Sequence, residues 1–296
     1  MNLQQKLIDF KPAREYFIGF DSDGCVFDTM EIKQKECFCP NFIQYFELQS
    51  VSKYAREIWE FVNLYSKTRG VNRFLALIDA FRLLETRREV QQRNYNPRDI
   101  SSLVEWTKKE TKLGNPALER YASETNDAFI DLCLKWSLEV NRQIGKMVYG
   151  IAPFPYFRDS LDAVQGRADA IVVSQTPVEA LEREWKENDI AQFVSIIAGQ
   201  EYGTKTEHLK FTAKGKYDDD KILMIGDAPG DLKAANANGV LFFPVNPGKE
   251  EESWERFFKE GSYRFFNGTF KGDYQDELIR EFEKHLPERP PWDKKD

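Results

Sequence analysis

Hydrophobic residues gather along this chain in two different patterns. Near the start, the short apolar run from Tyr16 to Phe20 ends at Asp21. Runs of the same kind recur only in the second half of the chain, at 170–174, 193–197, 222–227 and 240–244. Stretches with helical spacing lie between those later runs, at 177–187, 206–213 and 231–238. Continuous apolar strands that alternate with helices predict a parallel sheet covered by helices on both faces.

The segment from about residue 31 to residue 150 has the second pattern. Its apolar residues recur at helical spacing, for example in 55–62 and 73–78, and few β-branched runs interrupt it. We therefore predict an α/β fold, a Rossmann-like parallel sheet with an inserted all-helical domain. The expected boundaries are 1–29 and 152–296 for the core and 30–151 for the insertion. We also expect a helical tail beyond Gly248 whose proline-containing end, 288–291, frays.

Composition narrows the range of partners. The 296 residues are 41% hydrophobic, which is enough for a sizeable core, and the net charge is −7. An acidic chain without a basic run is a poor match for nucleic acid or an anionic membrane. The first ten residues lack the basic-then-apolar pattern of a secretory leader, so we expect none. We also expect neither a membrane span nor a disulfide framework, because no apolar stretch is long enough and the chain has only four cysteines. We expect a cytoplasmic protein.

Polar residues follow three of the predicted strands. They are Asp21 with Asp23, Ser174, and Asp227 with Asp231. The carboxyl ends of parallel strands meet at one edge of a sheet, so these side chains are expected to converge there. Carboxylates brought together repel one another unless a cation neutralises them, and hard oxygen ligands suit Mg²⁺. The pattern predicts a magnesium site.

Four short motifs carry a resemblance to a known family. Residues 21–28, Asp-Ser-Asp-Gly-Cys-Val-Phe-Asp, follow an apolar strand and resemble the first motif of the haloacid dehalogenase (HAD) superfamily. Ser174 resembles the second motif, Lys205 at the opening of a helix the third, and Gly226 to Asp231 the fourth. A helical insertion directly after the first motif is similar to the cap of the branch that contains phosphoglycolate phosphatases and β-phosphoglucomutases.

The resemblance implies a phosphatase that uses a covalent intermediate. Asp21 is the expected nucleophile, which forms an aspartyl-phosphate, and Asp23 is the expected general acid and base. Ser174 is expected to bind a phosphoryl oxygen, and Lys205 to neutralise charge on the transferring group. Ser174 also fits a helix cap before Pro177, and the two roles are compatible.

The same resemblance implies a magnesium site made of four residues. Its ligands are expected to be Asp21, the backbone carbonyl of Asp23, Asp227 and Asp231, with Asp231 acting directly or through a water. Dehalogenases of the superfamily lack the second acid of the first motif, so Asp23 argues against carbon–halogen cleavage.

The insertion contributes candidates for substrate binding. Residues 69–73, Arg-Gly-Val-Asn-Arg, are similar to a substrate loop of β-phosphoglucomutase-like caps, which implicates Arg73 and Arg69. An arginine on a solvated helix start is the alternative interpretation of Arg73. Gly24 and Gln175, which lie in or beside the first two motifs, are assigned to the same role.

The expected substrate is a small phosphorylated metabolite; two-carbon acids, sugar phosphates and nucleotides all remain candidates. Lys33 stands where related mutases have a hinge histidine, which favours hydrolysis. A β-phosphoglucomutase-like phosphosugar mutase and a catalytically silent phosphometabolite-binding protein are the two alternatives.

Overall fold

The computed structural model describes residues 3–93 and 95–293. The chain forms two compact units. The first is an α/β unit of the residues up to Met30 together with Gly150–Leu286. The second is a helical unit of Glu31–Tyr149 and the described residues that follow Leu286. The limits Glu31 and Tyr149 lie within two residues of those predicted for the insertion, 30 and 151. The described residues after Leu286, which were predicted to belong to the core, belong to the helical unit instead.

The α/β unit is built on a five-stranded sheet in the order β3-β2-β1-β4-β5, with every neighbouring pair parallel. The predicted parallel α/β fold is therefore confirmed. The strand predicted at 193–197 is shifted: residues 191–193 form a short 3-10 helix, and the strand begins only at Ile196. The strands are β1 (Tyr16–Phe20), β2 (Ala168–Val173), β3 (Ile196–Ala198), β4 (Ile222–Gly226) and β5 (Leu241–Pro244).

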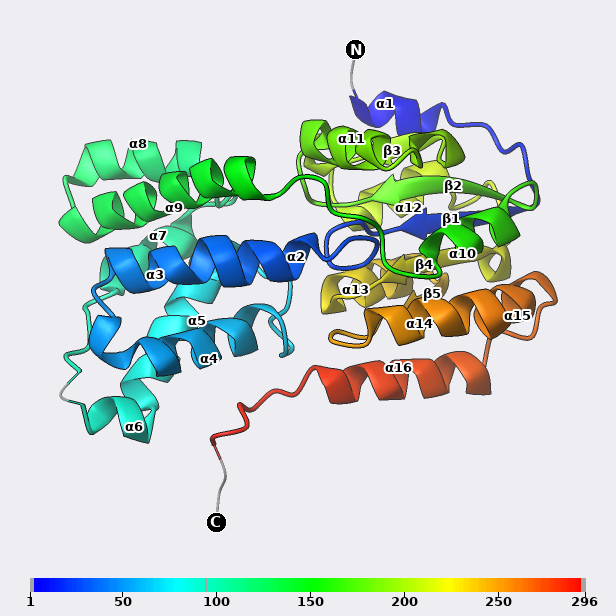
Figure 1. Cartoon of the computed structure of the whole chain (residues 1–296). Helices are drawn as coiled ribbons and strands as arrows, with labels where there is room; N and C mark the ends of the chain where they lie inside the picture. Colours follow the sequence, from blue (N-terminus) through cyan, green and yellow to red (C-terminus); the bar gives the residue numbers. More distant parts are fainter. Residues whose placement is uncertain (1–2, 94, 294–296) are drawn as a thin grey trace. The chain divides into compact units, whose positions relative to one another are not determined.

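Helices enclose this sheet (Figure 1). They are α1 (Leu3–Ile8), α10 (Phe157–Val164), α11 (Val178–Glu187), α12 (Lys205–Thr212), α13 (Pro229–Asn238), α14 (Glu250–Arg256), α15 (Ser262–Phe266) and α16 (Asp273–His285), with the π-helix η6 (Phe257–Gly261) and the 3-10 helices η3 (Ala191–Phe193), η4 (Gln200–Tyr202) and η5 (Asp219–Lys221).

The two faces of the sheet bury different residues of the same strands. In β1, Ile18 and Phe20 belong to a core shared with α10, α11, α14 and α15. Phe17 belongs to the core on the opposite face, shared with α12, α13 and α16. Side chains alternate along a strand, so a strand buried on both faces carries apolar residues at most positions. This explains why the strands are mostly apolar in the sequence; the exception is the buried Asp169 in β2, which accepts a hydrogen bond from the Tyr217 hydroxyl at 2.6 Å.

The helical unit has its own aromatic core. Trp59, Trp106 and Trp136 are buried there, and Tyr121 and Phe129 pack against the same cluster. These aromatic side chains therefore form or border the core of the helical unit. The helices are α2 (Thr29–Ile32), which spans the boundary between the units, the π-helix η1 (Lys33–Phe38), α3 (Cys39–Tyr45), the 3-10 helix η2 (Gln49–Val51), α4 (Ser52–Asn63), α5 (Arg73–Thr86), α6 (Arg88–Gln91), α7 (Ser101–Lys109), α8 (Asn115–Thr125) and α9 (Ala128–Met147).

The described end of the chain packs on the helical unit. The ring of Trp292 lies 5.6 Å from that of Phe61, and the Arg87 guanidinium stacks 4.2 Å from the Trp292 ring centre. Lys67 also pairs with Glu288 at 2.8 Å. The expectation that 288–291 fray is therefore wrong for this segment, because one tryptophan beyond the prolines supplies the apolar and cation–π contacts that anchor it.

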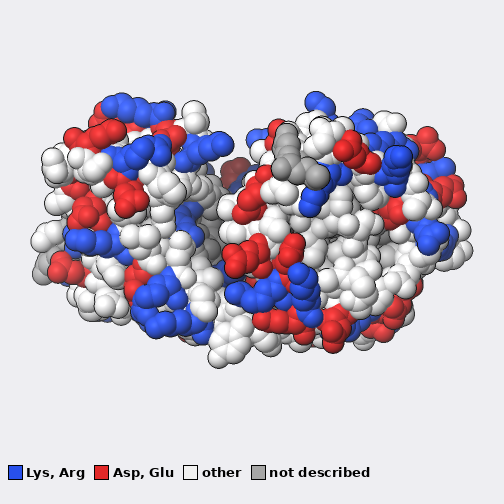
Figure 2. All heavy atoms as spheres, turned by 90° about the horizontal axis from the view of Figure 1, so that it is seen from above, with Lys and Arg blue, Asp and Glu red and all other residues white. Residues whose placement is uncertain are grey.

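Charged side chains of both signs are interspersed on the face that Figure 2 shows. Among the described residues, none of the helices combines the length and the apolar character that crossing a membrane requires.

Candidate active site

Three aspartates converge where β1 and β4 end. Asp21 follows β1, Asp227 follows β4, and the N–H of Asp21 donates to the carbonyl of Ile225 at 2.9 Å. One carboxylate oxygen each of Asp21, Asp227 and Asp231 lies within 4.8 Å of the others. All three side chains are buried. The parallel register of β1 and β4 thus brings together acids that are about two hundred residues apart in sequence.

Asp231 enters this cluster from the first turn of α13. Its Oδ2 accepts a hydrogen bond from the N–H of Ala228 at 3.1 Å, so the carboxylate caps the helix that carries it. Gly226 makes room for it, because a Cβ atom added there would lie 2.4 Å from the Asp231 Cγ. The glycine of the fourth motif therefore allows the close approach of this acid.

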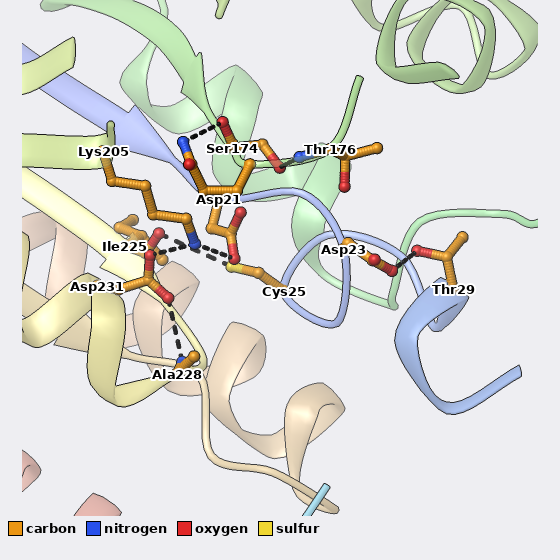
Figure 3. A network of polar contacts seen from close by, with 11 residues as sticks. Asp21, Asp23, Cys25, Thr29, Ser174, Thr176, Lys205, Ile225, Ala228 and Asp231 are labelled. Carbon is orange, nitrogen blue, oxygen red and sulfur yellow. Dashed lines mark hydrogen bonds and ion pairs between the residues drawn. The ribbon is translucent and has the colours of Figure 1, made fainter. Parts of the chain in front are cut away.

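Lys205 contributes an ammonium group to the same cluster. It is the first residue of α12, whose N-terminus is fixed by a capping box between Thr204 and Glu207. Its Nζ lies 2.9 Å from Oδ2 of Asp21 and 2.6 Å from Oδ1 of Asp231. Figure 3 shows the lysine side chain reaching between the two acids.

Burial and charge shift the pKa values of this cluster. Burial alone would lower the pKa of Lys205, but the neighbouring Asp21 and Asp231 outweigh it and hold that pKa well above its usual range. Burial raises the pKa of Asp231 to about 6, although Lys205 acts in the opposite direction. The lysine is therefore charged at neutral pH.

The cluster fits a divalent cation. Three carboxylates and one ammonium leave two negative charges in a buried place, and a divalent ion would balance them. The donors are hard oxygen atoms of the kind that Mg²⁺ prefers. A search of the described residues for three or more acidic, His or Cys side chains that could share one ion finds Asp21, Asp227 and Asp231.

Asp23 lies two residues beyond the nucleophile candidate, in the loop that follows β1. Its side chain is partly exposed, and the hydroxyl of Thr29 donates to its Oδ1 (Figure 3). Gly24 follows with φ of 86°, a conformation that favours glycine, so it shapes the turn. Asp23 can therefore reach solvent or a ligand while its neighbour Asp21 stays buried.

Ser174 and Gln175 follow β2 at the same edge of the sheet. The buried Ser174 hydroxyl oxygen accepts from the N–H of Thr176 at 3.2 Å, and its own proton can still be donated to a ligand. The Gln175 amide donates to the carbonyl of Gly203 at 2.9 Å, which links this loop to the one before Lys205. The helix-cap interpretation of Ser174 is wrong, because the N-cap of α11 is Pro177 and has no side-chain cap hydrogen bond; Ser174 instead holds the turn before the helix, and phosphate binding by it stays a prediction.

Arg69 and Arg73 lie in the helical unit and donate hydrogen bonds to other residues of that unit. Arg69 donates to the carbonyl of Leu64 at 2.9 Å. Arg73 donates to Oγ of Ser137 at 2.9 Å and to Oδ1 of Asn141 at 2.7 Å, and burial lowers its pKa to about 10. Arg73 is thus packed into helices rather than solvated at a helix start, and substrate binding by these two residues stays a prediction.

Sequence reasoning missed three residues that support the site. Thr204 and Glu207 orient Lys205, and the Thr-x-x-Glu spacing at a helix start was a signal that could have revealed them. Thr29 holds Asp23, but no spacing rule links a threonine to an acid six residues before it.

Comparison with family models and with curated proteins finds no match. Among solved structures, the chain is similar to a proposed phosphoglycolate phosphatase from Lactobacillus delbrueckii subsp. bulgaricus, with 16% identity, 83% of this chain and 92% of that chain covered, and a TM-score of 0.45.

The chain is also similar to a haloacid dehalogenase-like hydrolase from Streptococcus pneumoniae, with 13% identity and a TM-score of 0.44. The match covers 90% of this chain and 98% of that chain. A third similar structure is a HAD-superfamily hydrolase of subfamily IA from Geobacter sulfurreducens, with 17% identity and a TM-score of 0.38. The match covers 79% of this chain and 89% of that chain. The activities named for these three proteins are their own.

Proposed function

We propose that this protein is a magnesium-dependent phosphatase that hydrolyses a small phosphorylated metabolite through an aspartyl-phosphate on Asp21. The observation that carries the proposal is the convergence of Asp21, Asp227 and Asp231 around Lys205 at the carboxyl edge of the sheet. Like charges are not gathered in a buried place by packing alone. A site that binds a cation and a phosphoryl group explains them.

In the first step, a carboxylate oxygen of Asp21 attacks phosphorus and forms an O–P bond. The bond between phosphorus and the leaving oxygen breaks, and Asp23 donates its proton to that oxygen. In the second step, Asp23 takes a proton from a water molecule that attacks phosphorus. The O–P bond to Asp21 then breaks and releases inorganic phosphate. One phosphoester and one water yield one alcohol and one phosphate.

Other side chains of the site would stabilise the transferring group. Ser174 would donate its hydroxyl proton to a phosphoryl oxygen, and Lys205 would offset the negative charge that phosphate adds. Asp21 and Asp227 would hold Mg²⁺ together with the carbonyl of Asp23, and the bound ion would supply further charge neutralisation. Asp231, whose oxygens already meet Lys205 and the Ala228 N–H, would support the ion and fix the lysine.

The decisive experiment is turnover of p-nitrophenyl phosphate with and without magnesium. Wild type should release phosphate only with the metal, and Asp21→Asn should lose turnover because an amide cannot act as the nucleophile. Trapping of a phosphorylated protein with a labelled substrate, lost in Asp21→Asn, would identify the intermediate.

A panel of phosphate esters would then define the substrate. Free phosphate from one group of esters supports hydrolysis. Isomerised sugar phosphate without free phosphate would indicate a mutase. Absence of turnover across the panel, with magnesium and ester still binding, would indicate a catalytically silent binding protein and refute the proposal.

A further inference from the structure

Two buried tryptophans donate hydrogen bonds to the loop at residues 21–27. The indole Nε1–H of Trp185 donates to Oγ of Ser22 at 3.0 Å. The indole Nε1–H of Trp254 donates to the backbone carbonyl of Cys25 at 2.7 Å. All four residues have no exposed surface. This loop carries Asp21 and Asp23, the two acids that the proposed reaction uses, so the position of the loop determines the positions of their carboxylates.

Ser22 is the central acceptor of the loop. Its carbonyl oxygen accepts from the N–H of Val26 at 2.9 Å and from that of Phe27 at 3.1 Å. Its hydroxyl accepts from the indole of Trp185, and its two peptide bonds lead directly to Asp21 and Asp23. A displacement of Ser22 would therefore move both acids.

The two tryptophans reach the loop from opposite sides of β1. Trp185 lies on α11, which follows β2, and Trp254 lies on α14, which follows β5. In the sheet, β2 and β5 stand on opposite sides of β1. Phe157 packs against both indoles, with ring centres 5.9 Å from Trp185 and 4.8 Å from Trp254. The donors thus belong to one aromatic cluster.

Burial by itself does not impose these hydrogen bonds. Trp136 in the helical unit is equally buried, yet its indole nitrogen has no hydrogen-bond partner among the described residues. A phenylalanine would fill much of the same space, but only an indole also offers an N–H donor. At both Trp185 and Trp254 that donor is directed at the same short loop.

We infer that Trp185 and Trp254 are positioning residues that fix the loop of Asp21 and Asp23 for phosphoryl transfer; the inference rests on the proposed function. Reacting atoms must be placed closely, and a misplacement of about 1 Å can cost roughly 100-fold in rate. The two indole hydrogen bonds restrain the loop between the acids. They act through Ser22 and Cys25 and do not touch the reacting atoms.

Removing one donor should slow chemistry without weakening substrate binding. We expect Trp185→Phe to lower kcat for p-nitrophenyl phosphate by about 10-fold, with KM within about 2-fold of wild type, because one loop restraint is lost. Trp254→Phe should act in the same direction. Trp136→Phe, the same exchange at a buried site in the helical unit, is the matched control and should keep the wild-type kcat.

A double-mutant cycle separates positioning from packing. Ser22→Ala leaves the Trp185 donor without an acceptor, so it should lower kcat at least as much as Trp185→Phe. The double variant should lose no more than Ser22→Ala alone, because the two changes remove one shared contact. If the two losses multiply, or if a folded Trp185→Phe protein keeps the wild-type kcat, the inference is wrong. Should Trp185→Phe not fold, a wild-type kcat in Ser22→Ala would overturn it as well.

The contact can also be tested without catalysis. The indole ¹H–¹⁵N resonance of Trp185, assigned from its loss in Trp185→Phe, should shift in Ser22→Ala, while that of Trp136 should not. An unshifted Trp185 resonance would overturn the inference even in an active enzyme. An inactive wild type that shows the expected shift would refute the proposed phosphatase and leave the restraint of the loop in place.

Discussion

The Nζ atom of Lys205 lies 2.9 Å from Oδ2 of Asp21 and joins the start of α12 to the end of β1. The same ammonium lies 2.6 Å from Asp231, so one cation serves two buried acids. In the proposed reaction this group offsets charge at the place where a phosphoryl group would add more. The four predictions below depend on this arrangement and on the residues packed around it.

Removing the Lys205 charge should impair the chemical step. We expect Lys205→Met to lower kcat for p-nitrophenyl phosphate by about 100-fold, because a preorganised charge next to the transferring group is lost. Lys210→Met is the control, since Lys210 lies exposed on the same helix and should leave kcat unchanged. A Lys205→Met enzyme with wild-type kcat would show that the ammonium has no part in the reaction.

The two acids that follow β4 should differ in their effect on magnesium. Asp227→Asn should raise the magnesium concentration for half-maximal activity by about 100-fold or more, because a charged oxygen ligand is lost. Asp231→Asn should raise it less and lower kcat more, since Asp231 also holds Lys205. Magnesium titrations of initial rates, together with calorimetry on the proteins without substrate, give both quantities. Equal magnesium shifts in the two variants would contradict the division of roles.

A methyl group at Gly226 should disturb Asp231. An added Cβ would lie 2.4 Å from the Asp231 Cγ, which is closer than packed atoms approach, so the carboxylate must move. We expect Gly226→Ala to lower kcat by about 10- to 100-fold. Gly230→Ala is the control within the same motif, because a Cβ there meets nothing within 4 Å. A crystal structure of Gly226→Ala with Asp231 in place would disprove this explanation of the glycine.

Acid should destabilise the protein through His208. Burial, and then the nearby Lys205 charge, lower the pKa of His208 to about 4, whereas an unfolded histidine titrates near about 6.5. Below about pH 6.5 the unfolded state binds a proton at His208, whereas the folded state binds it only near about pH 4. The free energy of unfolding therefore falls as the pH falls through this range.

The loss attributable to His208 should reach about 2 kcal/mol by pH 5. Urea unfolding of wild type and His208→Leu between pH 7 and pH 5 measures it. The variant lacks the titrating group, so its free energy of unfolding should fall less steeply over this range. Parallel curves for the two proteins would show that His208 titrates alike in both states.

Several features of the fold could be predicted because they depend on local pattern. The strands are buried on both faces, so their positions are mostly apolar, as in Ile222–Gly226. The start of α12 at Lys205 follows from its capping box. The end of the chain could not be predicted in this way, because Trp292 is held by Phe61 and Arg87, more than two hundred residues earlier.

The sequence by itself determined which groups meet at the edge of the sheet. Acids placed directly after apolar strands must converge once those strands run parallel, so Asp21 and Asp227 follow from the order of residues alone. Only the tertiary structure decided that Lys205 reaches both Asp21 and Asp231, and that Trp185 donates to Ser22. These contacts join segments far apart in the chain, and their geometry depends on how helices pack against the sheet, which no local pattern encodes.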